Sequence, residues 1–199
     1  MRTAEESLKS LHAGNLRFLR GETTCRSVSA ETRRAMLSGQ DPLAAVLTCS
    51  DARVSPDIIF DAGLGELFVV RIGGAVLDSA GLASLEFAVA ELAVPLILVI
   101  GHEDCGTVRL AASGRMPPGS IGTLTSSYSM PVSQAKATHA GASEDEVLAE
   151  VTRGHALQVA ETLPRRSFVI SDGVAKGTLH IGAAMYWIST GKVELIHAA

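Results

Sequence analysis

Aromatic residues and cysteines are scarce in this sequence, and both shortages narrow the class of protein. Aromatic residues make up 4% of the 199 residues, so the core must be built mainly from Ala, Val, Leu and Ile. Such a core suits a packed α/β domain better than a β-sandwich. The three cysteines are an odd and sparse set, which argues against a disulfide scaffold and for a reducing compartment. We therefore expect a cytoplasmic α/β protein.

Long runs of basic or of apolar residues are also missing. The net charge is −4, and no basic run is long enough to follow a phosphate backbone, so we expect no nucleic-acid partner. The most apolar window, residues 94–100, is far shorter than the roughly 20 residues that cross a membrane. The N-terminal residues are polar and amphipathic, unlike a secretory signal. The sequence thus predicts no membrane association.

Short apolar runs alternate with helical patterns along the chain, and 47% of the residues are hydrophobic. This length and composition predict a single domain over residues 1–199. Alternation of strands and helices implies right-handed crossovers and a largely parallel sheet, ending here in an antiparallel hairpin. We expect four parallel strands and one antiparallel C-terminal strand, flanked by helices. The expected strands are 43–48, 66–71, 95–101, 178–186 and 192–196.

Two segments differ from this alternation. Residues 1–40 predict a helical arm, whose amphipathic helix at 3–20 could lie on its own domain or on a partner subunit. Residues 113–145 are rich in Ser, Gly, Pro and Thr, and we expect an irregular loop region or a weakly formed helix there. Near its end, Ser143 followed by Glu146 resembles a capping box, which predicts that a helix begins at this point.

Side chains that bind metals follow two of the expected strands. Cys49 and Asp51 come directly after the first strand, and His102 and Cys105 come after the third. Ligands bind at the carboxyl ends of strands in α/β sheets, so these side chains should meet. Two sulfurs, an imidazole and a carboxylate match tetrahedral Zn²⁺, for which Cys₂His with one further position is a catalytic arrangement. His102 and Cys105 are three residues apart, so one turn could aim both at a single ion.

Other chemistries for the same residues fail on spacing. Arg53 follows Cys49 by only four positions, whereas a phosphatase loop needs its arginine six positions after the cysteine. No CxxC is present for dithiol chemistry, and the glycines at 63–65 and 73–74 do not match a dinucleotide fingerprint. A single buried cysteine is usually only a small hydrophobe. The joint pattern at two strand ends favours a metal site.

Some residues of the same types receive no role in this site. We expect Cys25 to be a free thiol and Asp104 only to orient its loop. Surface or packing positions are expected for the histidines that lack a partner at metal spacing, which are His12, His139, His155, His180 and His197.

The residues around these positions resemble a known family. CSDARVSPDIIFDAGLGELFVVR, followed later by GHEDCG, is similar to β-class carbonic anhydrases, and the likeness covers nearly the whole chain except residues 113–145. It implies a zinc enzyme whose metal ligands are Cys49, His102 and Cys105. It also implies a homodimer or homotetramer, in which the N-terminal helices pack on a partner subunit.

The resemblance further assigns residues beside the metal. Asp51 and Arg53 match the family's aspartate–arginine pair, and Gln40 matches a glutamine that hydrogen-bonds substrate across a subunit interface. Zinc lowers the pKa of its bound water to about 7, which supplies hydroxide for attack on CO₂. Asp51 would orient that hydroxide, and Arg53 would hold Asp51 off the metal by a two-pronged ion pair. If the pair breaks, Asp51 can become the fourth ligand and close the site.

Three functions fit such a site. The first is reversible hydration of CO₂ to bicarbonate and a proton. The second is hydrolysis of COS or CS₂, because relatives with this metal site act on those substrates and because Ile72 replaces a residue that is more often polar in the family. The third is a structural zinc protein that Asp51 closes permanently. We favour the first, since its chemistry needs nothing beyond the residues found here.

Overall fold

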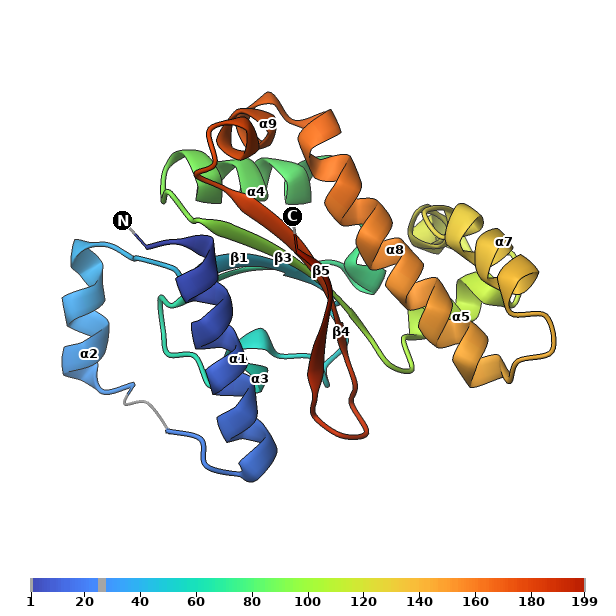
Figure 1. Ribbon diagram of the computed structural model, residues 1–199, viewed down its shortest axis with the longest axis horizontal. Coiled ribbons are helices and arrows are strands. Elements are labelled where there is room, and N and C mark those ends of the chain that lie inside the picture. Colours follow the sequence, from blue (N-terminus) through green and yellow to red (C-terminus); the bar gives the residue numbers. More distant parts are fainter. Residues whose placement is uncertain (1, 25–27, 199) are drawn as a thin grey trace.

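The chain forms a five-stranded sheet between two layers of helices (Figure 1). A computed structural model describes residues 2–24 and 28–198. The strands are β1 (Ala44–Thr48), β2 (Leu67–Arg71), β3 (Leu96–His102), β4 (His180–Tyr186) and β5 (Val193–Ala198). Their order is β2-β1-β3-β4-β5, and every pair is parallel except β4 with β5. The predicted sheet of four parallel strands and one antiparallel C-terminal strand is confirmed.

Helices cover both faces of this sheet (Figure 1). The helices of the described residues are α1 (Ala4–Arg20), α2 (Ala30–Ala35), α3 (Pro56–Ile59), α4 (Ser79–Ala90), α5 (Gly106–Ala112), α6 (Gly122–Ser126), α7 (Ser129–Thr138), α8 (Glu144–Arg166) and α9 (Phe168–Ala175). Leu47 and Val99 belong to a core shared with α4, α8 and α9, whereas Val46 and Leu98 belong to a core shared with α1 and α3. Because successive side chains of a strand point to opposite faces and helices cover both faces, all five residues of β1 are buried.

Helix α1 lies against the sheet of its own chain. The hydroxyl of Ser7 donates to the carbonyl of Leu43 at 2.7 Å. The buried amide of Asn15 donates to the carbonyls of Ile59 and Gly191, at 3.1 and 2.9 Å. These bonds hold the helix to both α3 and the β4–β5 turn of its own chain, and packing of the N-terminal helices on a partner subunit stays a prediction. Helix α2, in contrast, has no buried residue.

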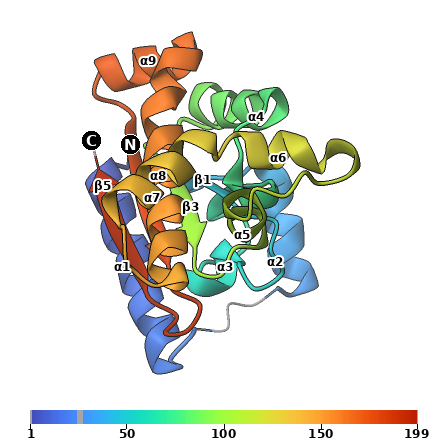
Figure 2. The same ribbon diagram turned by 90° about the vertical axis from the view of Figure 1, so that its right-hand side faces the viewer.

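Of the two alternatives predicted for residues 113–145, the irregular loop is wrong for much of the segment, and the helix is found there as α6 and α7. Helix α6 lies beside α5, and α7 lies beside α8 (Figure 2). Tyr128, Val132 and Ala135 join one apolar cluster at spacings of four and three residues, which is helical. Serines and threonines between them hide this period, and packing on α8 stabilises a helix of weak intrinsic propensity. The capping box of Ser143 and Glu146 is confirmed.

Among the described residues, no helix combines the length and the apolar character that crossing a membrane requires.

The close contact of α1 with α3 gives a test of this packing. A Cβ on Gly14 of α1 would lie 1.8 Å from the carbonyl oxygen of Phe60, whereas a Cβ on Gly154 of α8 would meet its nearest atom at 3.8 Å. Gly14→Ala should therefore lower the free energy of unfolding by about 1–3 kcal/mol through overpacking. Gly154→Ala should raise it by about 0.5–1 kcal/mol through helix propensity.

Urea denaturation of both variants and the wild type measures these changes. A Gly14→Ala protein as stable as Gly154→Ala would show that α1 does not pack on α3 of its own chain in solution.

Candidate metal centre

Cys49, His102 and Cys105 meet at the carboxyl edge of the sheet. Their ligand atoms all lie within 4.8 Å of one another, a spacing that one metal ion can bridge. The three side chains are buried, with exposed fractions of 5%, 1% and 4%. Cys49 directly follows β1 and His102 ends β3, and these neighbouring parallel strands bring the two halves of the group together.

One turn brings both His102 and Cys105 to the metal group, as predicted from their spacing, and this turn is not helical. His102 is the last residue of β3, and Cys105 is the N-cap of α5. Between them Asp104 has φ 53°, a left-handed conformation that Asp adopts more readily than most residues with a side chain. The carboxylate of Glu103 accepts hydrogen bonds from the N–H and hydroxyl of Ser189, at 2.7 and 3.0 Å. The turn is thereby fixed to the connection between β4 and β5.

The imidazole of His102 is prepared to bind a metal. Its Nδ1 lies 2.8 Å from the carbonyl oxygen of Glu103, and because a carbonyl can only accept, Nδ1 carries the proton. Nε2 is then the unprotonated nitrogen, and it is buried without a hydrogen-bond partner in the part of the chain that the structure describes. Such an orphaned nitrogen is costly, and metal binding removes the cost. The donor set and this free nitrogen fit a metal ion.

The two thiols are tuned in opposite directions. Cys49 accepts hydrogen bonds from the backbone N–H groups of Asp51 and Gly74, at 3.4 and 3.1 Å. The adjacent thiol of Cys105 above all, and these N–H groups, lower the pKa of Cys49 to about 4 despite its burial. The pKa of Cys105 is raised by the adjacent Cys49 and by burial. A divalent cation between the sulfurs would offset their repulsion and let both ionise.

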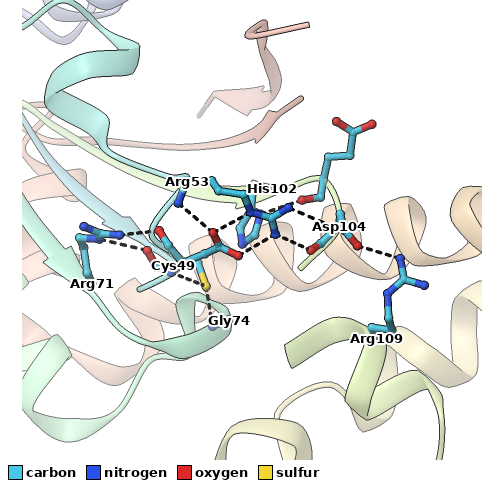
Figure 3. A network of polar contacts seen from close by, with 9 residues as sticks. Cys49, Arg53, Arg71, Gly74, His102, Asp104 and Arg109 are labelled. Atoms are coloured by element: carbon cyan, nitrogen blue, oxygen red, sulfur yellow. Dashed lines mark hydrogen bonds and ion pairs between the residues drawn. The ribbon is translucent and has the colours of Figure 1, made fainter. Parts of the chain in front are cut away.

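Asp51 and Arg53 form the two-pronged ion pair that was predicted (Figure 3). The Nε and Nη2 of Arg53 donate to the two carboxylate oxygens of Asp51, at 3.0 and 2.8 Å, and its backbone N–H donates at 2.9 Å. Hydrogen bonding to Arg53 is the main reason why the pKa of Asp51 falls to about 2. Asp51 is therefore ionised and turned toward Arg53.

Several residues around the centre have no predicted role. Arg71, at the end of β2, donates to the carbonyl oxygens of Cys49 and Asp51 at 3.2 and 2.6 Å, which fixes the backbone after β1. Gly74 has φ 68°, and its carbonyl accepts a hydrogen bond from the buried hydroxyl of Tyr128. Arginine and glycine at these positions carry no metal-binding pattern, and Tyr128 lies in the segment expected to be irregular.

His155 is the buried histidine that the sequence had assigned to surface or packing. Its ring stacks on that of Tyr128, with centroids 4.0 Å apart, and burial lowers its pKa to about 4. His155 and the metal ligands line a cavity of about 10 Å³, which is large enough for about one water molecule. The other histidines without a predicted role are exposed: His12, His139, His180 and His197. Cys25, predicted to be a free thiol, lies outside the described residues.

Gln40 is not brought to the metal group of its own chain. It is exposed and precedes β1, whereas Cys49 follows β1. A strand of five residues spans roughly 16 Å, so the two positions lie at opposite ends of the sheet.

The sequence matches one protein family over most of its length. The family model described as carbonic anhydrase matches residues 44–193. A carbonic anhydrase of Mycolicibacterium smegmatis is 38% identical over 192 residues, which cover 94% of this chain and 90% of the relative. Carbonic anhydrase 2 of Mycobacterium tuberculosis is 39% identical over 190 residues, with the same two coverages.

Solved structures agree with this fold. The β-carbonic anhydrase of Coccomyxa, in complex with acetazolamide, has a TM-score of 0.76 at 25% identity and covers 85% of this chain and 79% of its own. One of two tetrameric β-carbonic anhydrases from Sordaria macrospora has a TM-score of 0.74 at 22% identity, with coverages of 84% and 87%.

The geometry predicts one divalent metal ion per chain, bound through two thiolates. Cobalt loading should produce thiolate-to-cobalt charge-transfer absorption, and Cys105→Ala should remove about half of it and weaken zinc binding by roughly tenfold or more. His139→Ala is the control, because His139 is an exposed histidine outside the ligand group of the described residues, and it should leave both quantities unchanged. Full charge-transfer intensity in Cys105→Ala would contradict this ligand set.

Proposed function

The chain belongs to the β-class carbonic anhydrase family, and from that premise we propose that it catalyses the reversible hydration of CO₂ to bicarbonate and a proton. The observation that supports this most is the buried group of two sulfurs and one unpartnered imidazole nitrogen, beside the ion pair of Asp51 and Arg53. We assign Zn²⁺ as the metal, because Cys₂His with one further position is a known catalytic zinc set. The ligands would be Cys49, His102 and Cys105.

Bound zinc supplies hydroxide near neutral pH, because it lowers the pKa of water to about 7. The protein's own part begins at Asp51, whose carboxylate can only accept hydrogen bonds while it is ionised. Accepting one from the attacking oxygen would turn a lone pair of that oxygen toward the carbon of CO₂. Arg53 keeps the carboxylate in this orientation by occupying both of its oxygens.

Hydrogen bonds to Cys49 affect how strongly a bound metal would lower the pKa of its water. Two thiolates donate more charge to a metal than imidazoles do, which weakens the activation of water. The N–H groups of Asp51 and Gly74 point at the sulfur of Cys49 and draw charge from it. Such contacts from surrounding groups tune a metal centre, and here they would partly restore its acidity. The working pH would still lie above that of a centre with three histidines.

Asp51 has a second possible position in this proposal. If it leaves Arg53, its carboxylate can serve as the fourth zinc ligand, and the centre then has no position for water. The ligand atoms identified as one group include no Asp51 oxygen, which agrees with a carboxylate held by Arg53. The closed form would be inactive.

Gln40 would act only in an assembly of subunits. Its place at the opposite end of β1 excludes it from the metal group of its own chain, so it would contact substrate at a neighbouring subunit. We propose a homodimer or homotetramer on this ground, and the fungal relative described as tetrameric agrees with it. The sparse cysteines favour a cytoplasmic enzyme.

Stopped-flow CO₂ hydration between about pH 6.5 and 9 tests the activity over the range in which zinc-bound water ionises. We expect rates that rise with pH, disappear when zinc is removed and return when it is added. Zinc-loaded protein that hydrates no CO₂ at any pH would contradict the proposal. COS and CS₂ assays on the same sample would then distinguish a different substrate from a permanently closed centre.

Arg53→Ala tests the role of the ion pair. Without the Arg53 side chain, Asp51 loses two of its three hydrogen bonds and its ion pair and should move to the metal, so turnover should fall by roughly 10- to 100-fold at pH 7.5. The control is Arg165→Ala, which removes an equal charge from an exposed position in the last turn of α8 and should change little. Equal turnover in the two variants would exclude the proposed role of Arg53.

A further inference from the structure

Arg53 is held from two sides (Figure 3). On one side Asp51 accepts from Nε and Nη2, as described above. On the other side Asp104 accepts from Nη1 through its Oδ2 and from Nη2 through its backbone carbonyl, both at 3.0 Å. These four bonds use four of the five N–H groups of a rigid, planar guanidinium. Asp104 therefore accepts as many hydrogen bonds from the Arg53 guanidinium as Asp51 does.

A second arginine binds Asp104 in turn. The Nη2 of Arg109 donates to Oδ1 of Asp104 at 2.8 Å, so the two carboxylate oxygens are divided between two arginines (Figure 3). Arg109 and then Arg53 lower the pKa of Asp104. Arg109 also lies 3.5 and 3.9 Å from Glu144 and Asp145, in the first turn of α8. Alternating charges thus connect the metal centre to the start of α8.

The charge of Arg109 determines whether Asp104 stabilises or weakens the ion pair of Asp51 and Arg53. A carboxylate without a second partner would draw Arg53 toward itself and would repel the carboxylate of Asp51. Arg109 neutralises that charge, which leaves Asp104 as an anchor for Arg53. Each of these partly exposed pairs would stabilise little alone, but connected charges with fixed geometry can do more.

The turn that positions the metal ligands also positions the carboxylate of Asp104. Asp104 occupies the left-handed position between His102 and Cys105, and the backbone N–H of Arg109 bonds to the carbonyl of Cys105 at 3.0 Å. The carboxylate of Asp104 and the first turn of α5 are therefore placed by the same few residues.

We propose that Asp104 and Arg109 are positioning residues for Arg53, and that they determine how often Asp51 remains on Arg53 rather than on the metal. This inference rests on the proposed function, because it concerns the carboxylate that orients the nucleophile or closes the centre. Neither residue contacts the reacting atoms, and both act through the orientation of one guanidinium.

Two variants test the contributions of Asp104 and Arg109 separately. Asp104→Gly removes the carboxylate and keeps a residue that adopts positive φ, so the turn survives. Arg109→Gln leaves the carboxylate and the turn but removes the neutralising charge. The control is Glu144→Gln, which alters only the exposed far end of the network, 3.5 Å from Arg109.

The first readout is the order of the Arg53 side chain in the metal-free protein, from ¹⁵N relaxation of its Nε–H group. We expect lower order in Asp104→Gly and no change in Glu144→Gln. The second readout is azide binding to the cobalt-loaded protein at one fixed pH, followed in the visible spectrum, because an anion binds only where Asp51 does not occupy the fourth position. Azide affinity should fall by about threefold to tenfold in both Asp104→Gly and Arg109→Gln.

Unchanged Arg53 order in Asp104→Gly, or azide affinity that stays the same or rises in that variant, would overturn the anchor role. If Asp104→Gly does not fold, Arg109→Gln carries the test, and unchanged azide affinity there overturns the proposal. An equal loss in Glu144→Gln would overturn it too, since net charge alone would then explain the effect. The relaxation measurement needs neither metal nor substrate, so failure of CO₂ hydration in the wild type would count against the proposed function and not against this anchor.

Discussion

Strands β1 and β3 pair in a register that sets Thr48 beside Ile100, and the metal ligands depend on this pairing. Both strands are buried on both faces, and the hydroxyl of Thr48 donates to the carbonyl of Ile100 at 3.0 Å. A shift of one residue would turn each side chain of β1 to the opposite face and would separate Cys49 from His102. Two half-sites that are distant in the sequence thus become one group without any flexible segment between strand and ligand.

The strands and ligands could be predicted from the sequence because their signals are local. One apolar run ends at Thr48 and another at Gly101, and residues with metal-binding side chains follow both. The left-handed turn at Asp104, the support from Arg71 and the stacking of Tyr128 on His155 could not be predicted in this way. Each depends on contacts between segments far apart in the chain, and Asp104 had been given no more than a role in orienting its loop.

The ligands are supported by separate parts of the fold. Gly74, after β2, donates to the sulfur of Cys49, and Glu103 accepts from the ring of His102 and holds the β4–β5 connection. Asp104 extends the support outward through Arg53. Cys49, His102 and Arg53 are therefore each held by a hydrogen bond with a supporting residue, as expected for a centre whose geometry must be set before the metal arrives.

The closeness of two sulfurs in the metal centre has a consequence for redox chemistry. Hydrogen bonds to Cys49 favour its thiolate form, and the sulfur of Cys105 lies within 4.8 Å of it. A thiolate is the form that oxidants attack, and a neighbouring thiol is the group that completes a disulfide. Coordination by a metal would occupy both sulfurs at once, so a bound ion would keep this pair from that reaction.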